Sequence, residues 1–276
     1  MTEQTEIGNN GEAFREPDTA AAQIAAETKP VFTFGGKPPI QCKEKTSLKF
    51  CIYGKNGIGK TTFVSQMKKP VFLDLEKNMG HLSVDRFPIE SFIEFERCLV
   101  DLLNKPHDYS TVAIDSIDKL EALCFEYVKE KFPKELNYGK DYRHVEDCLH
   151  KTIKHVEKLF VKRKMNIVFI GHETTEKIGE NPTSEDYGRF TPRIREKFWT
   201  IIGDWVNCIL YATNEKVQDK KSKGKEEGCQ GRVIYTTPTH AYVAKNIYEL
   251  PPVLPLNWIV FRNAVNKFYE PKISAS

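Results

Sequence analysis

The sequence lacks any apolar run long enough to span a membrane. Its strongest stretches, such as residues 71–73 and 167–170, fall far short of the roughly 18 apolar residues that a spanning helix needs. The N-terminus has neither the basic start nor the apolar stretch of a secretory signal, so we expect none. The seven cysteines are odd in number and no two have C-x-x-C spacing, which argues against a zinc site or a disulfide framework. We therefore expect a cytoplasmic protein with reduced thiols and no membrane partner.

A large excess of charge is also missing. The sequence has 41 lysines and arginines and 38 aspartates and glutamates, which gives a net charge of +3. A net charge this small does not by itself indicate nucleic-acid binding. With 40% hydrophobic and 29% charged residues, the composition excludes a collagenous or wholly disordered chain. Residues 1–45 differ from the rest because they lack a sustained apolar face and contain the turn-forming stretches GNNG and GGKPP. We expect residues 1–45 to form a disordered tail and residues 46–276 to form the folded domain.

From Leu48 onward, short apolar runs alternate with amphipathic helical patterns. The runs LKFCIY, PVFLDL, TVAIDSI and NIVFIG are continuous, which is typical of strands buried on both faces. Helices are predicted between them, at residues 60–67, 91–103, 118–131 and 144–164. This alternation predicts an α/β fold with a mostly parallel, twisted sheet flanked by helices. After about residue 204, WVNCILYAT and RVIYTTP predict an antiparallel hairpin extension, joined by a lysine-rich connection at residues 214–231.

The clearest motif is GKNGIGKT, residues 54–61, a full match to G-x-x-x-x-G-K-[ST] between a predicted strand and a predicted helix. Its glycines let successive backbone N–H groups face phosphates at the positive end of a helix. Lys60 would reach the terminal phosphates, and the Thr61 hydroxyl would hold Mg²⁺. An incidental glycine-rich turn is the alternative. The predicted nucleotide-binding residues are Gly54, Lys55, Asn56, Gly57, Ile58, Gly59, Lys60, Thr61 and Thr62.

Three other predicted strands end in polar side chains that would meet at one edge of the sheet. Asp115 ends TVAID and would complete the Mg²⁺ site, although it could instead cap the following helix. Glu76 would point to the same face as Asp74, because side chains alternate along a strand. It could polarise a water for attack on the γ-phosphate, or it could be a solvated acid in a loop. His172 follows NIVFIG and could hydrogen-bond a phosphate oxygen or that water, or be a structural histidine.

In their order along the chain, GKNGIGKT, FLDLE, VAIDSID and FIGH resemble the core of RecA-like recombinases. More closely, the chain is similar to the compact, phage-encoded RecA-like ATPases of single-strand annealing, and YGKDY, PRIREKFW and AKNIYELP extend the resemblance over about residues 46–250. The resemblance implies a RecA-like P-loop core of the AAA/RecA superfamily, with ATP and Mg²⁺ as ligands. It also implies DNA-stimulated ATP hydrolysis and a role with single-stranded DNA in homologous recombination or annealing, in a bacterial host. RecA itself usually has Gln where this chain has His172, and its flanking domains have no counterpart here.

The resemblance further implies two DNA-contacting loops, at residues 136–144 and 174–195. Cations interleaved with aromatic rings suit a single strand, because phosphates need charge and exposed bases need a stacking surface. The candidate DNA-binding residues are Lys140, Tyr142, Arg143, Lys177, Arg189, Phe190, Arg193 and Arg195. A polar active-site lid is the alternative. Lysines spaced along the predicted helix at residues 144–164 indicate a solvated face of that helix. The lysine-rich residues 218–228 indicate a flexible hairpin tip or an auxiliary DNA-binding arm.

Lys245 matches a position from which RecA-like polymers send a lysine into a neighbouring subunit's ATP site, so assembly into a ring or filament would control hydrolysis. An ordinary surface position for Lys245 is the alternative. The candidate catalytic residues are thus Glu76, Lys60, His172 and Lys245. The implied partners are single-stranded DNA, further copies of this chain and a single-strand-binding protein. Two other functions fit the same motifs: a small-molecule or nucleotide kinase with an arginine-rich lid, and a non-hydrolysing module whose nucleotide sets its oligomeric state.

Overall fold

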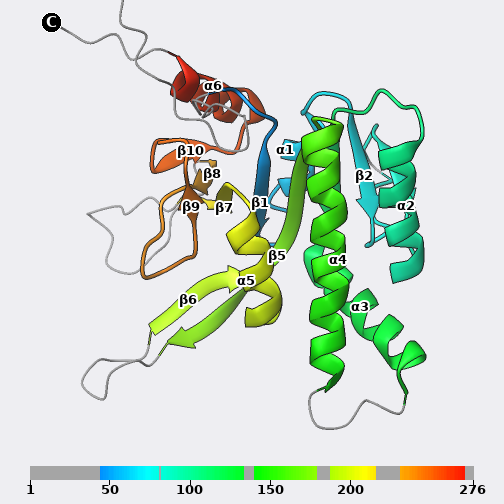
Figure 1. The fold of residues 1–276 in the computed structure, drawn as a ribbon. Coiled ribbons are helices and arrows are strands. Elements are labelled where there is room, and N and C mark those ends of the chain that lie inside the picture. Colours follow the sequence, from blue (N-terminus) through cyan, green and yellow to red (C-terminus); the bar gives the residue numbers. More distant parts are fainter. Residues whose placement is uncertain (1–43, 81, 134–139, 179–186, 216–230, 271–276) are drawn as a thin grey trace, which may run out of the picture. The chain divides into compact units, whose positions relative to one another are not determined.

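The computed structural model describes residues 44–80, 82–133, 140–178, 187–215 and 231–270 (Figure 1). The strands are β1 (Lys49–Gly54), β2 (Pro70–Asp74), β3 (Asp85–Pro88), β4 (Thr111–Asp115), β5 (Asn166–Ile178), β6 (Tyr187–Pro192), β7 (Cys208–Asn214), β8 (Arg232–Tyr235), β9 (Lys245–Asn246) and β10 (Val253–Pro255). The helices are α1 (Lys60–Ser65), α2 (Phe92–Asn104), α3 (Ile117–Lys131), α4 (Lys140–Lys162), α5 (Glu196–Trp205) and α6 (Trp258–Tyr269).

The strands form a ten-stranded sheet in the order β10-β8-β7-β1-β5-β4-β2-β3, with β6 paired to β5 and β9 to β7. From β7 to β3 every neighbouring pair is parallel, whereas β8, β9 and β10 pair antiparallel beyond that core. The predicted α/β fold class, a mostly parallel sheet flanked by helices with antiparallel strands toward the C-terminus, is confirmed. The strand order also brings the carboxyl ends of β1, β5, β4 and β2 to one edge. There Gly54 lies beside His172, and Asp74 beside Asp115.

Two hydrophobic cores lie on the two faces of the sheet. Successive residues of a strand point to opposite faces, so in β1 Cys51 and Tyr53 join one core while Phe50 and Ile52 join the other. Helices α2, α3, α4 and α5 cover the first face, and α1 and α6 cover the second. On the second face the ring of Phe261 in α6 packs 5.6 Å from that of Phe50. Burial on both faces explains why the core strands are continuous apolar runs.

Most of the described residues of the two predicted DNA loops belong instead to regular elements. Strand β5 continues past residue 171 to Ile178 and forms an antiparallel hairpin with β6, seen projecting from the sheet in Figure 1. Helix α4 begins at Lys140, so residues 140–144 are helical rather than a loop. The base of the hairpin is held because Phe190 N donates to the Ala241 carbonyl and Val243 N donates to the Phe190 carbonyl. The Tyr53 hydroxyl donates to the carbonyl of Val243 (2.7 Å) and lies 3.1 Å from that of Phe190.

Several predicted segments lie outside the described residues. These are residues 1–43 of the expected tail, residues 136–139 and 179–186 of the expected DNA loops, and residues 216–230 of the lysine-rich connection. The division into a tail and one ATPase domain stays a prediction. Among the helices within the described ranges, none combines the length and the apolar character needed to cross a bilayer.

Candidate nucleotide-binding site

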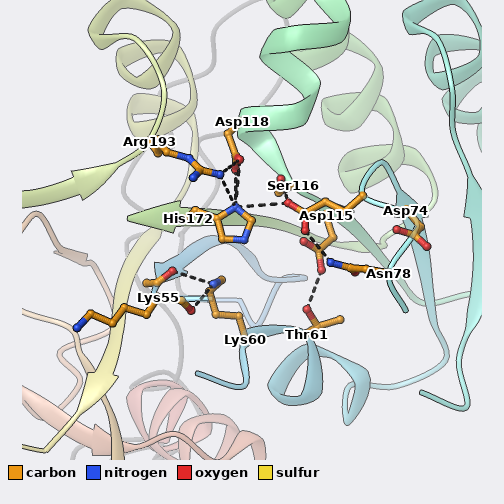
Figure 2. A network of polar contacts seen from close by, with 12 residues as sticks. Lys55, Lys60, Thr61, Asp74, Asn78, Asp115, Ser116, Asp118, His172 and Arg193 are labelled. Carbon is orange, nitrogen blue, oxygen red and sulfur yellow. Dashed lines mark hydrogen bonds and ion pairs between the residues drawn. The ribbon is translucent and has the colours of Figure 1, made fainter. Parts of the chain in front are cut away.

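The phosphate-binding motif forms the turn between β1 and α1 (Figure 2). Gly54 and Gly59 both have positive φ, 155° and 107°. A Cβ on Gly54 would overlap the carbonyl oxygen of Ala212 in β7, so the close approach of β1 and β7 requires glycine there. Gly59 precedes α1 in the left-handed region, a conformation that residues with a Cβ rarely adopt. The predicted motif therefore has the backbone that a phosphate-binding turn needs.

Lys60 is the buried cation of this turn. Its ammonium donates to the carbonyls of Gly54 (2.8 Å) and Lys55 (2.9 Å), and only 5% of the residue is exposed. Burial lowers the pKa of Lys60, and the carboxylates of Asp115 and Glu76 act against that shift. Figure 2 shows the Lys55 side chain pointing away from this group. Of the two lysines in the motif, Lys60 is thus the one positioned beside the acidic residues of the site.

Thr61 and Asp115 form the candidate magnesium site. The Thr61 hydroxyl donates to the Asp115 carboxylate at 2.7 Å, and Asp115 is 4% exposed. Burial raises the pKa of Asp115 to about 6, with a further contribution from Glu76, while Thr61 and Lys60 oppose the rise. A buried carboxylate beside a hydroxyl oxygen offers the hard oxygen ligands that Mg²⁺ prefers. The residues present therefore fit the predicted metal.

Glu76 and Asp74 have different surroundings, although they end the same strand region. The Glu76 carboxylate accepts hydrogen bonds from Ser116 Oγ (2.6 Å) and Asn78 Nδ2 (2.9 Å). Asp74 is fully buried and pairs with Arg86 at 2.6 Å. Glu76 lines the same cavity as Lys60, whereas Figure 2 shows Asp74 lying beyond Asp115. This geometry favours Glu76 over Asp74 as the acid that could act on a bound nucleotide.

These residues share one cavity of about 370 Å³. It is lined by Asn56, Gly57, Gly59, Lys60, Thr61, Thr62, Glu76, Asn78, Asp115, His172 and Arg232. Most of the residues predicted for the nucleotide, the metal and the reaction therefore come together in one place. Arg232 was not expected, because it lies far along the chain and in no recognised motif.

A family model described as an AAA domain (AAA_24) matches residues 46–248. This chain belongs to the AAA_24 family. A relative in Bacillus subtilis (strain 168), the SPbeta prophage-derived uncharacterized protein YorG, is 27% identical over 177 residues, which are 62% of this chain and 52% of the relative. The chain thus spans about half the length of that curated relative. A crystal structure of the RadB recombinase covers 69% of this chain and 80% of its own, with 14% identity and a TM-score of 0.39.

In this AAA domain, His172 belongs to a charge network, buried except for Arg193, that sequence reasoning found only in part. Its Nδ1 lies 3.0 Å from both oxygens of Asp118 and 3.4 Å from Glu76 Oε1. Arg193 donates to Asp118 at 2.7 Å and lies 3.3 Å from His172 Nδ1. Burial would raise the pKa of Asp118, but hydrogen bonds from His172 and Arg193 outweigh it and hold the pKa well below its ordinary value. Arg193, predicted for DNA, therefore reaches toward the nucleotide site.

Ligand atoms of Glu76, Asp118 and His172 lie within 4.8 Å of one another, a grouping that could hold a metal ion. Arg193 places a fixed positive charge on Asp118 in the same group. The signal for Asp118 was present in VAIDSID, three residues after Asp115, but the sequence pattern alone also fits a helix cap. Its partner Arg193 is 75 residues away, so the pairing depends on the tertiary structure.

The other candidate DNA-binding residues differ in their exposure and in their contacts. Lys177 and Arg143 are exposed, whereas Arg189 pairs with Glu176 at 3.4 Å. The Phe190 ring stacks inward on Tyr211, with centroids 5.4 Å apart.

The structure joins the two predicted DNA segments through Arg195. Its guanidinium lies over the rings of Phe125 (3.5 Å) and Tyr142 (4.4 Å). Tyr142 is itself 48% exposed. The side chain of Lys140 lies outside the described part of the chain. DNA binding by these residues stays a prediction.

Lys245 lies far from the P-loop of its own chain. Strand β9 pairs with the start of β7, Lys245 opposite Ile209, whereas the P-loop contacts the end of β7 at Ala212. Its ammonium donates to the carbonyls of Gly203 (2.9 Å) and Asp204 (3.2 Å) in the last turn of α5. A cation there satisfies carbonyls that the helix leaves unpaired. Its action in a neighbouring subunit stays a prediction.

Proposed function

We propose that this AAA domain is a Mg²⁺-dependent ATPase that acts with single-stranded DNA in recombination or single-strand annealing. One observation carries the ATPase part of the proposal. A single cavity brings together the buried ammonium of Lys60, the Thr61–Asp115 pair and the Glu76 carboxylate. Phosphoryl transfer needs this combination of positive charge, a metal site and a group that positions the nucleophile.

Each side chain has a defined task in the proposed reaction. Lys60 would exchange its carbonyl partners for phosphate oxygens, and Thr61 and Asp115 would hold Mg²⁺. The metal, when bound, supplies charge neutralisation at the phosphates. Glu76 would orient a water and accept its proton. Ser116 and Asn78 fix the orientation of the Glu76 carboxylate, so the water would meet a preorganised acceptor.

The DNA part of the proposal rests on how the hairpin is connected to this cavity. Strand β5 carries His172 at the cavity and Lys177 on the exposed hairpin five residues later. Arg193, directly after β6, returns to Asp118 and His172. A change in the His172 contacts on nucleotide binding would therefore reach the hairpin through both strands. If the hairpin binds DNA, nucleotide and DNA would raise each other's affinity, because thermodynamic coupling is reciprocal.

Steady-state turnover tests the ATPase proposal. We expect Mg²⁺-dependent ATP hydrolysis by the wild-type protein, its loss in Lys60→Ala, and wild-type rates in Lys68→Ala. Lys68 is an exposed lysine that follows α1 and does not line the cavity. The assay is run with and without single-stranded DNA and with a panel of phosphoryl acceptors. Turnover that depends on an acceptor would indicate a kinase, and nucleotide binding without turnover would indicate a regulatory module.

A charge-matched pair of double variants tests the DNA proposal. Lys177→Ala with Arg189→Ala removes two cations from the hairpin, and Lys154→Ala with Lys158→Ala removes two from the exposed face of α4. We expect the hairpin variant to weaken binding and to reduce the slope of log affinity against log salt by about 1.4, the value for two phosphate contacts to a single strand. An unchanged slope there, with a reduced slope in the α4 variant, would move the DNA site to α4.

We also propose that the protein acts as a ring or filament in which Lys245 enters a neighbour's site, and that a single-strand-binding protein delivers the DNA. Lys245 would have to leave the α5 carbonyls to do so. Electron micrographs with ATP and single-stranded DNA test the assembly. Mixtures of Lys60→Ala and Lys245→Ala proteins test the shared site, because a mixed interface would pair an intact Lys60 with an intact Lys245. Turnover by the mixture above that of either variant alone is the expected result.

A further inference from the structure

Arg232 is the cation of the nucleotide cavity that no recognised motif includes. It begins β8, two strands away from β1 in the sheet. Its backbone is fixed on both sides: Arg232 pairs with Asn214 in β7, and its carbonyl accepts a hydrogen bond from Leu256 N at 2.8 Å. A Cβ built on Gly59 would lie 3.1 Å from Nη1 of Arg232. The guanidinium therefore lies against the P-loop itself.

The Arg232 side chain has no hydrogen-bond or ion-pair partner within the described ranges of the chain. The two cavity carboxylates are already engaged, Asp115 by Thr61 and Glu76 by Ser116 and Asn78. Arg232 is also exposed, so its charge is available to a ligand that enters the cavity. A guanidinium presents several N–H donors in one plane, an arrangement that matches two oxygens of a phosphate group.

We infer that Arg232 binds the phosphate chain of the nucleotide, as a cation supplied by the same chain from the antiparallel extension of the sheet. The inference rests on the proposed function, since it deepens the assignment of the same cavity. It gives β8 a role in the site: the strand fixes the Arg232 backbone beside Gly59 while the side chain stays free to meet a ligand. The ligand class is a nucleoside di- or triphosphate, because a nucleoside monophosphate offers the least charge for a second cation beside Lys60.

The test is equilibrium binding of Mg-ATP, Mg-ADP and AMP to the full chain, by isothermal calorimetry or by displacement of a fluorescent ATP analogue. The variants are Arg232→Ala, Arg232→Lys and the control Arg262→Ala, which removes an exposed arginine of α6 that does not line the cavity. We expect Arg232→Ala to weaken Mg-ATP binding about tenfold or more, within the range for a hydrogen bond to a charged group. Arg232→Lys should recover part of the loss, since it restores charge without the planar fork. Arg262→Ala should bind as the wild type does.

Lys60→Ala separates failure of this inference from failure of the proposed function. If Lys60→Ala loses Mg-ATP binding while Arg232→Ala binds as the wild type does, the role of Arg232 is refuted and the nucleotide site stands. If the wild-type protein binds no nucleotide, the proposed function itself fails. Equal losses of AMP and ATP affinity in Arg232→Ala would also refute the assignment to a di- or triphosphate, because they would indicate a contact with the nucleoside or with the α-phosphate that AMP also carries. A melting curve checks the fold of each variant, and Arg232→Gln repeats the test if Arg232→Ala is unfolded.

Discussion

Removing Arg86 should destabilise the protein far more than its position on an exposed strand suggests. All four residues of β3 are exposed, but Arg86 pairs at 2.6 Å with the fully buried carboxylate of Asp74 in β2. In Arg86→Ala the buried carboxylate would keep the backbone N–H of Lys77 as a partner but lose its counter-charge. Breaking a buried ion pair in this way typically costs about 3–5 kcal/mol.

The lower end of that range applies here, because the Arg86 side chain is 34% exposed and water can partly replace it. We expect a loss of about 3 kcal/mol in the free energy of unfolding, from the buried-pair range. At about 2–4 °C per kcal/mol for a domain of this size, the melting temperature should fall by about 6–12 °C. The control is Lys69→Ala, which breaks an exposed pair with Asp108 and should cost at most about 1 kcal/mol.

Urea and thermal unfolding of four proteins complete the test: wild type, Arg86→Ala, Asp74→Asn and the double variant. In the Asp74→Asn background the carboxylate charge is absent, so Arg86→Ala should cost much less than in the wild type. This non-additivity isolates the ion pair from the rest of β3. If Arg86→Ala costs no more than Lys69→Ala, or costs the same in both backgrounds, the assigned role of the pair is wrong.

Four further predictions concern the site and the tail. Glu76→Gln should keep ATP binding but slow hydrolysis at least about 10²-fold; normal turnover there, with a loss in folded Asp74→Asn, would show that the wrong acid was chosen. Burial raises the pKa of Asp115 to about 6 from 3.8, so without metal its contribution to stability is fully present below pH 3.8 and is lost as the pH rises through 6. Between pH 4 and 7, the free energy of unfolding should therefore fall more steeply with pH in the wild type than in Asp115→Asn. The same dependence on pH in both proteins would contradict the raised pKa of Asp115. Deleting residues 1–40 should leave the melting temperature and turnover unchanged, and a large drop on melting would reveal a docked segment. His172→Ala should leave nucleotide-free DNA affinity nearly unchanged but remove the gain caused by a slowly hydrolysed ATP analogue, as measured by DNA titrations with and without it.

The elements predicted best from sequence are those whose burial is complete. Strands β1, β2, β4 and β5 are covered by helices on both faces, so their residues form unbroken apolar runs. Strand β3 gives no such signal, because Asp85–Pro88 is exposed and is held by pairing with β2 and by the Arg86–Asp74 ion pair. Helix α6 had a usable signal that was missed: Asn257 caps it, and Trp258, Phe261 and Val265 follow at helical spacing.

The residues of the site that were predicted from sequence are likewise those whose positions follow from nearby sequence. The P-loop is contiguous, and Asp115 and Glu76 follow predicted strands, so the chemistry at one edge of the sheet could be anticipated. Arg193 and Arg232 could not be placed, because their positions depend on the order of the strands. Asp118 lies close to Asp115 in the sequence, but its pattern there also fits a helix cap. Arg232 reaches Gly59 only because β8 follows β7 and β7 follows β1 in the sheet.

The hydroxyl of Tyr53 connects the base of the hairpin to a side chain of the P-loop strand. Tyr53 immediately precedes Gly54, and its hydroxyl contacts both the Val243 and the Phe190 carbonyls from a fully buried position. The amide hydrogens of Phe190 and Val243 are bonded within the same cluster. Exchange of these amides with solvent requires this cluster to open. Opening at Val243 removes its contacts with the Tyr53 hydroxyl, while the backbone of β1 stays paired with β5 and β7. Amide exchange at Val243, in the second half of the chain, would therefore report the local stability of the contacts that hold the Tyr53 side chain.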